Sequence, residues 1–140
     1  MSTEYVVEAV HRQGMQFECA VGAHSVMLDY PLKPEDPGAG PRPLEVLLGS
    51  LAACLGGTMV ALLCRAGQSF DSLTVRARGR RRAEHPTVFT EIGLELVLRG
   101  GVDGEVVKRC LSQAEEQICP VWAMLRPGTP IRASFRIETD

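Results

Sequence analysis

The sequence lacks several features that would place it in a common functional class. Its N-terminus has no basic segment followed by an apolar run, so we expect no signal peptide. The five cysteines include no Cys-x-x-Cys pair, and the three scattered histidines complete no zinc spacing. We therefore expect mostly free thiols in a reducing, cytoplasmic compartment, with no bound metal. No flavin or haem motif is present, so no cofactor is expected. The formal net charge of −2 gives no general attraction to nucleic acid or to an anionic membrane.

The sequence contains enough hydrophobic residues to form the core of one folded domain. Hydrophobic residues make up 45% of the 140-residue chain, which suits a single domain over residues 1–140. The periodicity predicts an α+β fold, an antiparallel sheet packed on a long helix. We expect strands at 5–10, 15–21 and 25–30, a proline-rich loop at 31–43, a helix at 44–66, a hairpin of strands 72–82 and 88–98, a helix at 105–118, a short helix at 120–125 and a last strand at 131–138.

The predicted helix at 44–66 carries no charge from Val46 to Cys64 and is apolar on nearly every face. Such a helix must be buried all round. A membrane span is one interpretation, but Gly49, Gly56 and Gly57 dilute the hydrophobicity, and both flanks are typical of compact soluble structure. The alternative is the central helix of a globular protein, which a small domain cannot wrap alone. We therefore expect no membrane span, and a homodimer with this helix at or near the interface.

Five arginines near the first strand of the hairpin raise the possibility of a nucleic-acid interface: Arg76, Arg78, Arg80, Arg81 and Arg82. Alternate arginines, however, fall on one face of a strand, as on the solvated side of an antiparallel sheet. The hairpin register places Arg76 opposite Glu95 and Arg80 opposite Glu91, and such pairs are mildly stabilising. No aromatic side chains are interleaved with the arginines. We therefore expect no nucleic-acid partner.

The five cysteines differ in how strongly the sequence around them indicates a reactive thiol. Cys110 lies on the apolar stripe of its helix and Cys64 at the end of the long helix, so core positions are expected for both, and Cys19 has no supporting feature. Cys54 stands among small residues that leave room for a ligand. Cys119 precedes Pro120, which favours an N-cap position and a thiol pKa lowered by the helix dipole. Cys54 and Cys119 are thus the candidate reactive thiols.

Two segments resemble the OsmC/Ohr family of osmotically inducible and organic-hydroperoxide-resistance proteins. One is GPRPLEVLLGSLAAC, from Gly40 to Cys54, and the other begins at Cys119-Pro120-Val121. The order of the expected elements fits the same family over nearly the whole chain. The resemblance implies an intertwined homodimer with two active sites at the subunit interface. It also implies a peroxidatic Cys54, a resolving Cys119, a hydroperoxide substrate and a thiol reductant.

The sequence departs from the peroxidase pattern at the position of an activating glutamate. Peroxidases of the family carry this glutamate ten residues before the first cysteine, paired with an arginine of the N-terminal strands, and Leu44 stands there instead. Glu45 is nine residues before Cys54, and at about 100° per residue it lies on the opposite face of the helix. Glu45 is therefore expected to be a first-turn acid that complements the helix dipole. Arg12 is the candidate for the arginine, or else a solvated loop residue.

Two functions follow as hypotheses from different classes. The first is a thiol-dependent peroxidase for organic hydroperoxides in oxidative-stress defence, with Cys54 and Cys119 as catalytic residues and Arg12 and Glu45 as possible supports. The second is an OsmC-like dimer that binds a small apolar ligand or senses redox state without efficient turnover, which Leu44 favours. A scaffold with both thiols inert is a third possibility.

Overall fold

The computed structural model describes residues 2–139, which form two compact units. The first unit extends to Leu47 and the second begins at Leu48, inside the first turns of a long helix. Most of the expected elements are present, within a few residues of the expected bounds. The expectation of one domain over residues 1–140 stays a prediction.

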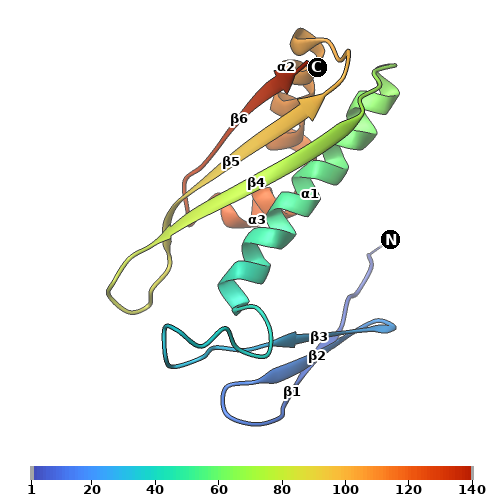
Figure 1. The fold of residues 1–140 in the computed structure, drawn as a ribbon. Helices are drawn as coiled ribbons and strands as arrows, with labels where there is room; N and C mark the ends of the chain where they lie inside the picture. The colour runs from blue at the N-terminus through green and yellow to red at the C-terminus, as the bar shows by residue number, and fades with distance from the viewer. Residues whose placement is uncertain (1, 140) are drawn as a thin grey trace. The chain divides into compact units, whose positions relative to one another are not determined.

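The N-terminal unit contains a three-stranded antiparallel sheet in the order β1-β2-β3 (Figure 1). Its strands are β1 (Val7–His11), β2 (Phe17–Val21) and β3 (His24–Leu28). Gly22 turns the chain between β2 and β3 with a φ of 60°, a backbone conformation that favours glycine. After β3, the carboxylate of the buried Asp29 accepts hydrogen bonds from the backbone N–H groups of Tyr30 and Ala39. These bonds hold the proline-rich loop in place.

The C-terminal unit is a three-stranded sheet with helices on one of its faces (Figure 1). The sheet has the order β4-β5-β6, and its strands are β4 (Ser72–Arg81), β5 (Phe89–Arg99) and β6 (Ile131–Glu138). The expected antiparallel sheet is corrected here, because β6 runs parallel to β5. The intervening helical segment reverses the chain direction, so β6 enters the sheet as the second strand of a crossover. The helices are α1 (Pro43–Arg65), α2 (Gly104–Gln113), η1 (Ala114–Ile118) and α3 (Pro120–Leu125).

The register of the β4–β5 hairpin confirms the predicted alignment of Arg76 with Glu95 and of Arg80 with Glu91. The register then shifts between Arg80 and Arg81, at the end of β4. This irregularity reverses the alternation of inward-facing and outward-facing side chains at the start of β5. Phe89 is therefore buried in the core.

Helix α1 is buried on one face rather than all round. The buried side is formed by Leu51, Leu55, Gly56, Met59, Leu62 and Leu63. A Cβ at Gly56 would lie 3.3 Å from Val75 of β4, so this glycine lets the helix approach the sheet closely. The opposite side exposes small residues, among them Ala53, Gly57 and Ala61. Among residues 2–139, α1 is the one helix long and apolar enough to cross a membrane, a test that core helices of soluble proteins also pass.

The expected single helix at 105–118 is in fact two segments. Helix α2 is α-helical and starts at an Asp103 N-cap whose side chain accepts from the Glu105 N–H. Its last turn continues as the π-helical segment η1, which contains one extra residue per turn relative to an α-helix. The wider turn rotates the chain, and Ile118 at the end of η1 is 41% exposed although it is apolar.

Candidate functional site

The two cysteines singled out in the sequence lie side by side in the C-terminal unit. The Sγ atoms of Cys54 and Cys119 are 3.2 Å apart, with the Cys119 thiol donating toward the sulfur of Cys54. Both are free thiols. Helix α1 supplies Cys54, and the junction between η1 and α3 supplies Cys119. The structure thus brings together two residues that are 65 positions apart in the sequence.

The π-helical segment η1 places Cys119 at this position. The backbone N–H of Cys119 donates to the carbonyl of Ala114, five residues earlier, at 2.9 Å. Cys119 is then the N-cap of α3, as predicted, and its carbonyl accepts from the Ala123 N–H at 3.1 Å. Pro120 occupies the first turn of α3. The wide turn ends one helix and the cap begins the next, so the backbone is held on both sides of the thiol.

The thiols differ in access to solvent. The residue Cys119 is 1% exposed, whereas Cys54 is half-buried. Gly57 lies one helical turn after Cys54, and a Cβ at this position would have no neighbouring atom within 4 Å. The space beside Cys54 on this side of the helix is therefore open. A small molecule can therefore reach Cys54 more readily than Cys119. The two thiols are therefore not equivalent in their access to solvent.

The prediction of a lowered pKa at Cys119 is wrong. Burial raises the pKa of the Cys119 thiol above its ordinary value, because the thiolate is poorly solvated there. The backbone N–H groups of Trp122 and Val121 act in the opposite direction, as a helix N-terminus should, while Cys54 raises the pKa further. Desolvation outweighs the contribution of a helix of six residues. Cys119 is consequently a protonated thiol at neutral pH.

This raised pKa predicts a pH-dependent difference in stability. The folded protein keeps the Cys119 proton at pH values where the unfolded chain, with a thiol pKa of about 8.5, has lost it. The free energy of unfolding contributed by this group is therefore intact below that pH and decreases as pH rises through the folded pKa. Urea unfolding under reducing conditions from neutral to alkaline pH should show wild type losing its advantage over Cys119→Ala. Parallel curves for the two proteins would contradict the assignment.

The two possible supporting residues have local partners within the N-terminal unit. Arg12 forms an ion pair with Glu18, with Nη2 and Oε1 2.6 Å apart. The pKa of Glu18 is lowered by a hydrogen bond from Ser25 and by Arg12. Glu45 accepts from the backbone N–H of Arg42 at 2.9 Å, which is half of a capping box at the start of α1. The prediction that Glu45 is a first-turn acid is confirmed.

The remaining cysteines follow the sequence-based expectation only in part. Cys110 is buried in the core, as expected. Cys64 is exposed at the end of α1, so the expectation of a core position is wrong there. Cys19 is half-buried on β2 and borders an apolar cavity of about 210 Å³ in the N-terminal unit. Among residues 2–139, no group of three or more His, Cys, Asp or Glu side chains is placed to hold a metal ion.

Comparison with known proteins shows the family to which the chain belongs. The model of the OsmC-like protein family matches residues 35–134. Protein YhfA of Escherichia coli strain K12 is 28% identical over 98 residues, which cover 69% of this chain and 73% of YhfA. The crystal structure of an OsmC-like protein from Mycoplasma pneumoniae has a TM-score of 0.86 at 20% identity, covering 98% of this chain and 99% of that one. The organic hydroperoxide resistance protein OhrB of Bacillus subtilis has a TM-score of 0.67 at 20% identity, with coverages of 96% and 98%.

Proposed function

Because the chain belongs to the OsmC-like family, we propose that it is a thiol-dependent peroxidase that reduces organic hydroperoxides. Cys54 is the attacking thiol and Cys119 the resolving thiol. The observation that carries this proposal is the 3.2 Å separation of two free thiols, one half-buried and one buried. The similarity of fold to an organic hydroperoxide resistance protein supports the choice of substrate class.

The proposed chemistry uses the two thiols in order. The Cys54 thiolate attacks the terminal peroxide oxygen, the O–O bond breaks, and a sulfenic acid forms at Cys54 while the alkoxide leaves and takes a proton from water to become the alcohol. The Cys119 sulfur then attacks the Cys54 sulfur, giving a disulfide and water. A dithiol reductant restores both thiols and is itself oxidised. The protonated Cys119 supplies a hydrogen bond before the first step and a proton for the water released in the second.

The proposal includes a homodimer in the cytoplasm. The exposed side of α1 consists largely of small and apolar residues, including Val60 at 38% exposure. A second copy would cover such a side, and the neighbouring small residues would leave space for an apolar peroxide beside Cys54. Sedimentation of the reduced protein at several concentrations would test this part by itself.

The test of the activity is stopped-flow consumption of cumene hydroperoxide with a dithiol reductant. Wild type should turn over, and Cys54→Ser should lose the reaction because no sulfur remains to accept the oxygen. Cys64→Ser is the matched control, since Cys64 is an exposed thiol on the same helix. It should react as wild type does. Equal slow rates for wild type and Cys54→Ser would refute the proposal.

A second candidate, an OsmC-like dimer that binds a small apolar ligand or senses redox state, is favoured by one observation. Glu45 is engaged in the cap of α1, and Leu44 has no carboxylate to offer. No residue of this segment is therefore free to act as the family's activating glutamate. Thermal stabilisation by a hydrophobic ligand, in the absence of peroxide turnover, would support this alternative.

A further inference from the structure

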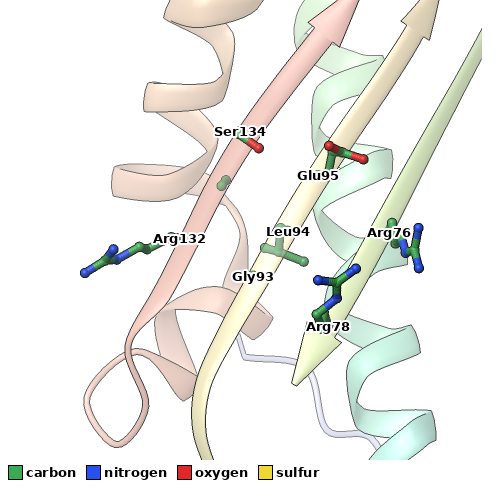
Figure 2. Close-up of a pocket in the computed structure, with 8 residues that line it drawn as sticks. Arg76, Arg78, Gly93, Leu94, Glu95, Arg132 and Ser134 are labelled. Carbon is green, nitrogen blue, oxygen red and sulfur yellow. The ribbon is translucent and has the colours of Figure 1, made fainter. Parts of the chain in front are cut away.

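The outward face of the β4-β5-β6 sheet contains a hollow of about 450 Å³ that the thiol chemistry does not use (Figure 2). Gly93 is one of the residues that line it and lies on β5, the middle strand. In the sheet register Gly93 stands between Arg78 of β4 and Arg132 of β6. A second hollow of about 380 Å³ shares the same three residues, so the two form one trough across the sheet. The helices cover the other face of the sheet (Figure 1).

The arginines around the hollow lack acidic partners. The carboxylates on this face pair with other arginines, in the ion pairs Arg80–Glu91 at 3.6 Å, Arg136–Glu95 at 3.7 Å and Arg99–Glu138 at 2.9 Å. Arg76, Arg78 and Arg132 line the hollow, and none has an ion pair or side-chain hydrogen bond within the part of the chain that the structure describes. The result is a local excess of positive charge on a chain whose net charge is −2.

Gly93 has no evident role in packing. A Cβ at Gly93 would meet no atom within 4 Å, and its φ is not positive, so other residues fit there without strain. Gly79 of the neighbouring strand is different, because its Cβ would lie 2.7 Å from the ring of Phe89. Glycine in the interior of a strand weakens the strand and often marks a place where a ligand approaches the backbone. The hollow over Gly93 exists because that position has no side chain.

We propose that this hollow binds a small organic anion with two or more negative charges, of the phosphate-ester or diphosphate class. An arginine guanidinium group can donate two parallel hydrogen bonds to the oxygens of one phosphate group. Long exposed arginine side chains on both sides of the hollow can turn toward a bound anion. In Figure 2, Arg76 and Arg78 stand on β4 and Arg132 on β6, with the hydroxyl of Ser134 at the rim. Glu95 also lines the hollow, and its charge is balanced by Arg136.

The observations favour a small molecule over a nucleic acid. No aromatic side chain lines either hollow among the described residues, so there is no platform for base stacking. Arg80, Glu91 and Glu95 also line the trough, and each of them forms an ion pair, so the unpaired positive charge is limited to Arg76, Arg78 and Arg132. The size of each hollow lies at the lower end of the range for small-molecule pockets, which is about 300–1,000 Å³.

Isothermal titration calorimetry of the reduced full-length protein with inorganic pyrophosphate at low salt tests the proposal. Wild type should bind one pyrophosphate per chain, more weakly as salt is added. Arg78→Gln and Arg132→Gln should each weaken binding by about tenfold. Gly93→Val should abolish binding because its side chain fills the hollow, and it should fold as stably as wild type or more so. Arg99→Gln is the matched control, on the same face but outside the hollow, and should bind within about twofold of wild type.

Three outcomes would overturn the proposal. One is pyrophosphate binding weaker than about 10 mM in wild type. Another is unchanged affinity in Gly93→Val, which would place the anion elsewhere. The third is a single-stranded oligonucleotide that binds more tightly than pyrophosphate and is unaffected by Gly93→Val, which would assign the arginines to nucleic acid. None of these results depends on Cys54, so the peroxidase proposal stands or fails separately.

Discussion

Deleting Gln117 is expected to slow formation of the Cys54–Cys119 disulfide by at least about 100-fold under mild oxidation. Gln117 lies in the π-helical segment η1, which fits one residue more into its turn than an α-helix does. Removing that residue lets the turn close as an α-helix. Every following atom then rotates by about 100° relative to α2.

The expected effect is large because the two sulfurs are now only 3.2 Å apart. A disulfide requires close approach with a defined torsion, so a shift of a few ångströms removes the pair. Quantifying free thiols after brief treatment with diamide measures the effect directly. Circular dichroism and a thermal melt establish that the deletion variant still folds.

The control for this deletion is Gln117→Ala, which keeps the length of η1 and changes only an exposed side chain. It should oxidise at the wild-type rate. If the deletion variant folds and oxidises as fast as wild type, η1 does not position Cys119. The rigid placement of the buried thiol would then arise from α3 alone.

Replacing Trp122 by alanine is expected to lower the free energy of unfolding by about 3–5 kcal/mol. Trp122 is the sole tryptophan of the chain and is 1% exposed, on the short helix α3. Alanine would remove most of this buried ring and leave a cavity that a well-packed core closes only in part. A loss of this size is a large fraction of the stability of a small domain, about 5–15 kcal/mol.

Urea unfolding followed by circular dichroism measures this change, because the variant lacks the one tryptophan whose fluorescence could otherwise report unfolding. Met124→Ala is the matched control, since Met124 lies on the same helix and is 73% exposed. Met124→Ala should change the free energy of unfolding by no more than about 0.5 kcal/mol. Equal losses for the two variants would contradict the assignment of Trp122 to the core, because alanine does not lower helix propensity at either position.

Local pattern was sufficient to predict most elements of this protein. Alternation and turn residues placed the hairpin, and its register followed from the turn at residues 83–87. Pro120 marked the start of α3 and made Cys119 its N-cap. The choice of Cys54 and Cys119 among five cysteines also came from their neighbours in the sequence and from the resemblance to a family.

Other features depended on contacts between distant residues. The parallel pairing of β6, the bulge that buries Phe89 and the single buried face of α1 each follow from how elements pack, which no local pattern encodes. The sequence had an N-cap signal for a lowered thiol pKa at Cys119. Desolvation by the surrounding core reversed its direction.

The sequence by itself thus determined which thiols are candidates and which elements carry them. Only the tertiary structure decided that they meet at 3.2 Å, that Cys119 is the protonated partner, and that Gly93 leaves a hollow between unpaired arginines. The physical reason is the same in each case. Distance, solvation and ion pairing depend on groups far apart in the chain, whereas helix, strand and cap signals depend on neighbours.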